Sequence, residues 1–167
     1  MISKIKKIAE IILLTAMFTS CKKEIGPLSD VKPAIAVTIT NAEAYRPEPT
    51  VTTSLSGSGS IQVVLSIPAT SGRKIKEISK VIASTTYSAI QGIGTGIVYY
   101  NSAPIPANGS TVTFTTSITE YFAKNAVSTA NPAAKADTEL ARRFYFLVTL
   151  DDNSVIIPEP VRILVLN

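Results

Sequence analysis

Short segments in which apolar and polar residues alternate recur along the chain after residue 34, and they constrain the fold more than any other feature. An alternation with a period of two places every second side chain on one face of a β-strand, so that this face can be buried. Residues 35–39, 61–67 and 111–116 show this alternation, whereas 143–150 and 161–166 carry apolar residues on both faces, which suits central strands. The pattern therefore predicts a domain built mainly from strands.

Three further segments are predicted as strands from their β-branched and apolar residues. Residues 50–55 are rich in threonine and valine, and 92–100 join glycine to isoleucine, valine and tyrosine. Residues 78–86 have a partly helix-like apolar spacing, but their β-branched run favours a strand. Glycines at 57 and 59 and the Asn108-Gly109 pair predict turns between these segments.

The C-terminal segments predict a closing hairpin, because a polar turn at 151–154 follows the strand at 143–150. The last strand, 161–166, comes after Pro158 and Pro160, which cannot donate hydrogen bonds within a ladder. Asp151, Asp152 and Asn153 could also supply oxygen ligands to calcium, but the ligand spacing of a calcium-binding loop is missing. A turn is the preferred interpretation.

One helical turn is predicted inside a long connection. Ser117 and Glu120 have the spacing of a capping box, which favours a helix start and a short helical turn through 121–126. Residues 127–139 are rich in alanine, serine and asparagine and predict an exposed loop. The region 123–141 is either a binding loop or a flexible insertion.

Some seven short strands with turns between them predict an all-β fold of two packed antiparallel sheets in one domain, residues 34–167. The segments 78–82 and 144–150, the turn at 151–153 and the last strand resemble bacterial immunoglobulin-like or fibronectin type III-like domains. The resemblance implies an immunoglobulin-like sandwich with a short helical turn in a long loop. The chain has no tryptophan and one cysteine, which excludes the antibody-type subclass with its disulfide and buried tryptophan.

The N-terminal residues predict an export signal. Lys4, Lys6 and Lys7 precede an apolar run that ends at Phe18, and small residues follow before Cys21. This run is much shorter than the roughly 20 residues that a spanning helix needs, so a lasting membrane span is not expected. Residues 1–20 are therefore predicted to be a cleaved signal peptide, and residues 22–33 a flexible tether.

Phe18-Thr19-Ser20-Cys21 resembles the lipobox of bacterial lipoproteins, although phenylalanine stands where the family usually has leucine. The resemblance implies that the Cys21 sulfur carries diacylglycerol, that cleavage occurs before Cys21, and that the new amino group is often acylated as well. Two or more chains give stable membrane anchoring. The implied location is a bacterial cell envelope, in the outer membrane, with either the periplasmic or the outer side possible.

Charge and composition exclude several functions. Residues 1–20 contribute three lysines and one glutamate to the 16 basic and 12 acidic side chains, so the remaining chain has a net charge of +2. This charge is dispersed, and we expect no nucleic-acid partner. The chain has no histidine and its one cysteine is assigned to the anchor, so no catalytic residues, metal site or cofactor are predicted.

Two functions follow as expectations. The first is a non-catalytic envelope lipoprotein that binds another protein, or stiffens an assembly, through its sheet surface or an exposed edge. The second is an accessory glycan-binding lipoprotein of an outer-membrane polysaccharide-uptake system, for which exposed aromatic rings would form the platform. Tyr99, Tyr100 and Tyr121 are the candidate binding residues.

Overall fold

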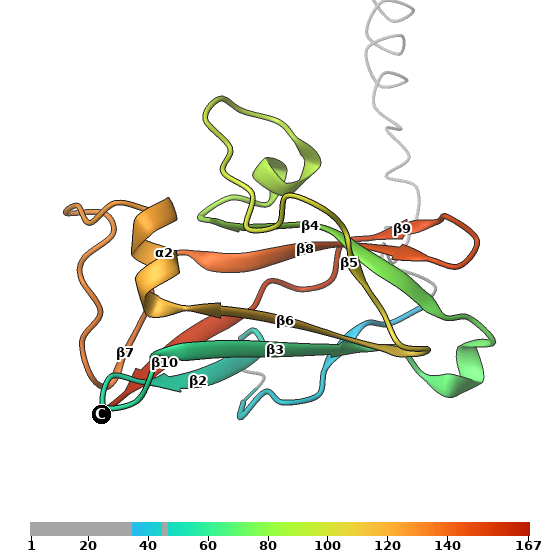
Figure 1. Ribbon diagram of the computed structural model, residues 1–167, viewed down its shortest axis with the longest axis horizontal. Helices are drawn as coiled ribbons and strands as arrows, with labels where there is room; N and C mark the ends of the chain where they lie inside the picture. Colours follow the sequence, from blue (N-terminus) through green and yellow to red (C-terminus); the bar gives the residue numbers. More distant parts are fainter. Residues whose placement is uncertain (1–34, 45–46) are drawn as a thin grey trace, which may run out of the picture. The chain divides into compact units, whose positions relative to one another are not determined.

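A computed structural model describes residues 35–44 and 47–167, which all belong to one unit. The described part is mostly β and contains ten strands, one α-helix and two 3₁₀ helices (Figure 1). The predicted signal peptide, Cys21 and the tether lie outside the described residues.

The elements have the following bounds. The strands are β1 (Thr38–Ile39), β2 (Thr50–Ser54), β3 (Ser60–Ser66), β4 (Ile75–Ser84), β5 (Ile105–Pro106), β6 (Thr111–Ser117), β7 (Thr138–Glu139), β8 (Arg143–Leu150), β9 (Val155–Ile156) and β10 (Arg162–Leu166). The helices are the 3₁₀ helices η1 (Ala69–Ser71) and η2 (Tyr87–Gln91) and the α-helix α2 (Ile118–Lys124).

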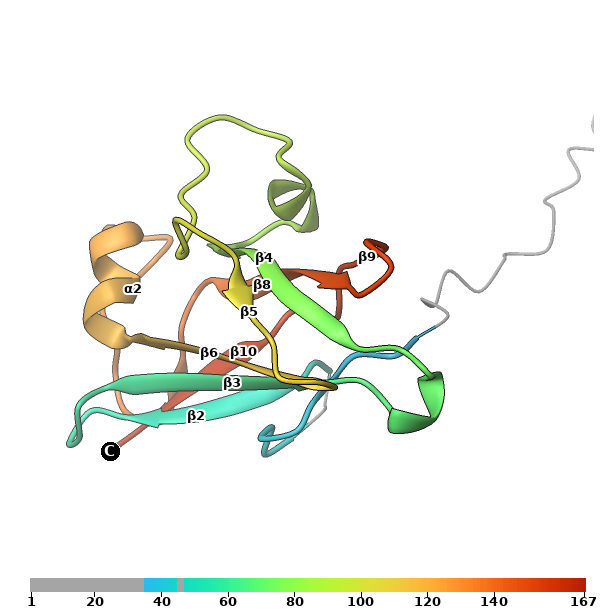
Figure 2. The same cartoon turned by 45° about the vertical axis from the view of Figure 1, so that its right-hand side comes forward.

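The strands form three hydrogen-bonded sheets, with the orders β1-β3-β6, β2-β10-β7 and β5-β4-β8-β9 (Figures 1 and 2). All strand pairs are antiparallel except β10 and β2, which run parallel. The longest pairing joins β4 to β8 with register shifts, whereas β3 and β6 pair without any irregularity.

The core is built from the alternating residues that the sequence pattern marks. In β3 and β6 every second side chain is buried, and Val63 and Phe114 stand opposite each other in the register. Phe146 from β8 and Ile163 from β10 join the same apolar cluster, so residues from all three sheets share one core. Burying each such side chain contributes about 1.5–3 kcal/mol, which explains why these segments become strands.

The C-terminal hairpin was predicted with the wrong partner strand for β8. β8 turns at 151–154 into the short strand β9, while β10 pairs with β2 and β7 and meets β8 only through the bridge between Phe144 and Val161. The prolines at 158 and 160 lack N–H groups, which interrupts the ladder and lets the chain change sheets. The expectation that all strands pair antiparallel is also wrong, because β10 pairs with β2 in the parallel direction.

The predicted strand at 92–100 is also wrong. η2 ends at Gln91, and an irregular segment follows with φ angles of +79° at Gly92, +128° at Gly94 and +69° at Gly96. Positive φ angles are incompatible with extended strand geometry. Figure 2 shows this excursion, in yellow-green, standing away from β4. The first predicted strand, 35–39, is reduced to Thr38–Ile39.

The helix start at Ser117 is confirmed. The Glu120 N–H donates to the Ser117 hydroxyl oxygen over 3.1 Å, and α2 runs from Ile118 to Lys124. The Glu120 carboxylate accepts a 2.7 Å hydrogen bond from the Thr116 hydroxyl. The connection after α2 is only partly the exposed loop that was predicted, because it contains β7 and buries Asn131.

Candidate functional site

Tyr121 holds α2 to the start of β8. Its side chain is fully buried, and its hydroxyl donates to Asn131 Oδ1 over 2.9 Å while accepting from the Arg142 backbone N–H over 3.0 Å. Burial raises the pKa of the Tyr121 hydroxyl, and the Arg142 N–H bond and charge oppose that rise. The structure thus places Tyr121 in the core, where its ring offers no surface to an outside ligand.

Asn131 organises the loop after α2. Its side-chain amide donates to the carbonyl oxygens of Asn125 (2.8 Å) and Ala126 (3.2 Å), and its oxygen accepts from Tyr121. A buried amide with these partners fixes the backbone around it, since leaving any of these groups unpaired would cost about 1–3 kcal/mol. This loop segment therefore has a defined conformation beside the end of α2.

Tyr100 lies mainly within the aromatic core. Its ring centroid is 5.0 Å from that of Phe144 and 5.8 Å from that of Phe114, and its hydroxyl accepts from Asn125 Nδ2 over 2.9 Å. Burial raises the pKa of the Tyr100 hydroxyl well above its usual range, and the Tyr121 hydroxyl adds to that rise. Lys124 Nζ lies 5.4 Å from the Tyr100 ring centroid, a cation–π distance.

Tyr99 is half-buried and belongs to a separate, smaller cluster. This cluster contains Ile82, Ile90 and Tyr145, and the Lys80 ammonium lies 5.1 Å from the Tyr99 ring centroid. The structure brings Tyr100 and Tyr121 to the same core region but places Tyr99 in the other cluster. The three tyrosines do not assemble into one exposed aromatic platform.

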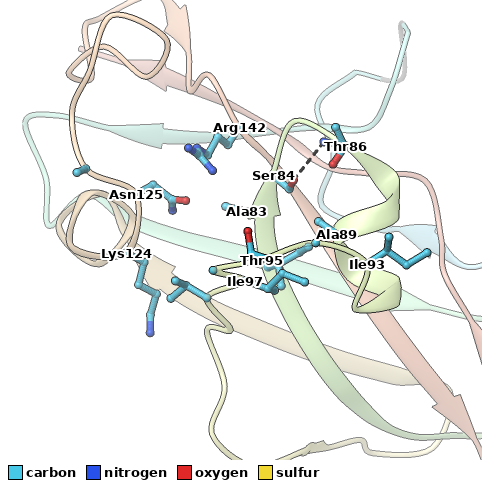
Figure 3. A pocket seen from close by; sticks show the side chains of 15 residues that line it. Ala83, Ser84, Thr86, Ala89, Ile93, Thr95, Ile97, Lys124, Asn125 and Arg142 are labelled. Atoms are coloured by element: carbon cyan, nitrogen blue, oxygen red, sulfur yellow. Dashed lines mark hydrogen bonds between the residues drawn. The ribbon is translucent and has the colours of Figure 1, made fainter.

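A pocket of about 420 Å³ opens between the excursion at 86–98, the end of α2 and the start of β8 (Figure 3). Its polar side chains are Ser84, Thr86, Thr95, Lys124, Asn125 and Arg142. Isoleucines, alanines, a valine and two glycines complete its wall, and no carboxylate of residues 35–44 and 47–167 lines it. Its size lies within the range of small-molecule sites.

β6 presents the longest exposed strand edge in the described chain. Ile67 N donates to Ser110 O and Ile118 N donates to Gly59 O at the two ends of the β3–β6 ladder. Because hydrogen-bonding direction alternates along a strand, the N–H and C=O groups of Thr113 and Thr115 point away from β3. Both threonines are exposed, and these four groups, which we call the β6 edge, have no backbone partner in the described residues.

The other edge strands of the three sheets are protected. β1, β5, β7 and β9 have two residues each, and β2 is largely buried. Short edges are one way in which proteins prevent unwanted strand pairing, as are charges, prolines and bulges. β6 has seven residues, TVTFTTS, with none of these features. Its edge can therefore accept another strand.

The Asp151-Asp152-Asn153 turn is held by an arginine. Arg73 Nε lies 2.8 Å from Asp151 Oδ1, and its guanidinium also pairs with Asp152. Hydrogen bonds from the Ser154 hydroxyl and N–H lower the pKa of Asp152, and the Arg73 charge acts in the same direction. In residues 35–44 and 47–167 no group of three or more histidine, cysteine, aspartate or glutamate side chains is placed to hold a metal ion.

No helix in the described ranges is long and apolar enough to cross a membrane. Comparison of the sequence with protein-family models gave no match, and comparison with curated proteins also gave none. The candidate sites therefore rest on the geometry of this chain alone.

Sequence reasoning missed the pocket and did not single out β6. Residues 86–98 and Arg142 contribute to the pocket. Part of 86–98 was predicted to be a regular strand, and Arg142 has the same side-chain chemistry as its sequence neighbour Arg143. No local pattern distinguishes a paired arginine from an unpaired one. An alternation such as that of 111–116 predicts a strand but not which strand lies at an edge.

Proposed function

We propose that this chain is a non-catalytic, lipid-anchored protein of a bacterial cell envelope that binds an extended segment of another envelope protein along the β6 edge. The observation that carries the proposal is the unpaired, uncharged edge at Thr113 and Thr115. Addition of a strand to such an edge is a common mode of peptide recognition, in which main-chain hydrogen bonds supply the affinity.

The proposed anchor rests on the lipobox-like residues before Cys21. Lipidation there would confine the domain to a membrane surface. Confinement raises the local concentration of any partner on the same membrane, so that a modest edge interaction becomes sufficient. The proposed lipid anchor and the β6 edge thus both support binding of a partner protein at the membrane.

We further propose that the domain is an immunoglobulin-like sandwich. The order β1-β3-β6 corresponds to strands A, B and E of that fold, and β4-β8-β9 corresponds to C, F and G. The placement of α2 between β6 and β8 fits the connection between strands E and F. In this assignment β6 has no strand D beside it, which explains why its edge is free.

Glycan binding through stacked tyrosines has less support. Tyr121 is buried and Tyr100 packs against core phenylalanines, so neither offers a free ring face comparable to a sugar platform. Tyr99 is half-buried in the smaller cluster, where neither Tyr100 nor Tyr121 joins it. We therefore place protein binding ahead of an accessory role in polysaccharide uptake.

Replacing Thr113 by proline should weaken partner binding by about tenfold or more, because the ring removes one N–H of the β6 edge and obstructs an incoming strand. The measurement is cross-linking in intact native cells, affinity recovery of the chain and quantitative mass spectrometry of the recovered partner. Thr113→Val is the matched control, since it keeps the N–H and the β-branched shape.

We expect one envelope protein to be recovered with the wild type and with Thr113→Val, and to be depleted with Thr113→Pro. Thermal unfolding of both variants checks that the domain still folds. Equal recovery with all three chains would refute binding at this edge. Recovery of only a second copy of the same chain would replace the proposal with self-association.

A further inference from the structure

The pocket beneath the excursion at 86–98 contains a cation without a counter-charge. Arg142 is partly buried and lines the pocket, and no carboxylate of the described residues lies within ion-pairing distance of its guanidinium. Figure 3 shows this side chain among those that line the pocket. The pocket thus offers one fixed positive charge to a ligand.

The other described arginines are all paired. Arg73 contacts Asp151 and Asp152, Arg143 Nε lies 2.7 Å from Glu48 Oε2, and Arg162 pairs with Glu139. Arg143 and Arg162 line a second pocket of about 300 Å³, where Glu139 already supplies the negative charge. Arg142 is therefore the arginine of the described chain that is free to bind an external anion.

Lys124 contributes less to this charge. Its ammonium donates to the Tyr99 carbonyl oxygen over 3.2 Å and lies 3.7 Å from Glu120 Oε1. In Figure 3 its Nζ points away from the other labelled side chains. The planar fork of Arg142 is then the main anion-binding group, and its geometry matches a carboxylate through two parallel hydrogen bonds.

Neutral polar groups line the same pocket. The hydroxyls of Thr86 and Thr95 and the amide oxygen of Asn125 belong to side chains that line the pocket, and the Asn125 amide nitrogen is used by Tyr100 and Tyr121. Ile97 supplies an apolar wall from the excursion. Hydroxyl and amide groups beside a short apolar surface suit a ligand that carries several hydroxyls and a C–H face.

We propose that this pocket binds a small hydroxylated carboxylate of about the size of one sugar acid, with its carboxylate on the Arg142 guanidinium. The volume of about 420 Å³ accommodates such a ligand. The residues that form this pocket are different from those of the β6 edge. The pocket proposal and the edge proposal are therefore independent, and either can be correct without the other.

The test is isothermal titration of the full chain in detergent with glucuronate, glucose and inorganic phosphate as probes. We expect saturable binding of glucuronate and at least tenfold weaker binding of glucose, which keeps the hydroxyls but lacks the carboxylate. Phosphate should also bind at least tenfold more weakly, because it has no C–H face for Ile97. Failure of glucuronate to bind, or equal binding of glucose or phosphate, would overturn the proposal.

Variants assign the binding to Arg142. Arg142→Gln should weaken glucuronate binding at least tenfold, and Arg142→Lys should weaken it less, because an ammonium keeps the charge but loses the fork. The contact of Arg142 with Tyr121 uses the backbone N–H, so it persists in both variants. Arg73→Gln is the matched control and should bind like the wild type; an equal loss in that variant would contradict the assignment.

Discussion

Replacing Phe144 by alanine should lower the free energy of unfolding by about 3–5 kcal/mol, the usual cost of removing a fully buried phenylalanine. Phe144 is completely buried in β8, and its ring meets those of Tyr100, Phe114 and Tyr121. These partners come from the segment before β5, from β6 and from α2. The substitution therefore removes a contact shared by three parts of the fold.

Urea unfolding followed by circular dichroism measures this loss. Phe122→Ala is the matched control, because Phe122 is only partly buried at the margin of the core and contacts Tyr121 alone among the rings. We expect a clearly smaller loss there, about 1–2 kcal/mol. Similar losses in the two variants would mean that Phe144 is not central to the core.

Replacing Cys21 by alanine should release the protein from the membrane fraction almost completely. The variant lacks the sulfur that the proposed diacylglycerol requires, and without acyl chains the hydrophobic attachment, about 0.8 kcal/mol for each buried methylene, disappears. Cys21 is the single cysteine of the chain, so no other thiol can replace it.

Labelling of growing cells with radioactive palmitate, followed by membrane fractionation, measures both consequences. Wild type should carry label and sediment with membranes, whereas Cys21→Ala should be unlabelled and remain in the supernatant. Ser20→Ala keeps a small residue before the cysteine and should behave as wild type. A labelled, membrane-bound Cys21→Ala chain would disprove the anchor.

The strands were predictable where local alternation and burial coincide. β3 and β6 follow their apolar alternation closely, because one face of each strand packs into the core. The start of α2 was predictable because Ser117 satisfies a helix N–H group within four residues of sequence. In each case the determining interaction is local or depends on one face of a single strand.

The predictions that failed concern two properties: contacts between residues far apart in the sequence, and backbone angles. The parallel pairing of Arg162 with Thr50 joins the two ends of the described domain, and the composition of one strand does not specify its partner. At 92–97, β-branched residues alternate with glycines as they could in a strand, but the positive φ angles at Gly92, Gly94 and Gly96 produce an irregular excursion.

The candidate site was predictable only in part. Tyr99, Tyr100 and Tyr121 were singled out by residue type, yet burial depends on where α2 packs, which residue type does not reveal. Arg142 differs from Arg143 only in its surroundings, since Arg143 meets Glu48 from a segment far away in the sequence. Pairing and burial of this kind arise from the tertiary fold.

Photo-cross-linking in intact native cells tests whether a partner binds along the β6 edge. A photoreactive amino acid replaces Thr115 on β6 or, as a control, Gln62, an exposed residue of the neighbouring strand β3 that faces Thr115 in the register. We expect a discrete adduct with one envelope protein from position 115 and a much weaker one from position 62. Absence of an adduct from position 115, or equal adducts from both positions, would contradict binding at the β6 edge.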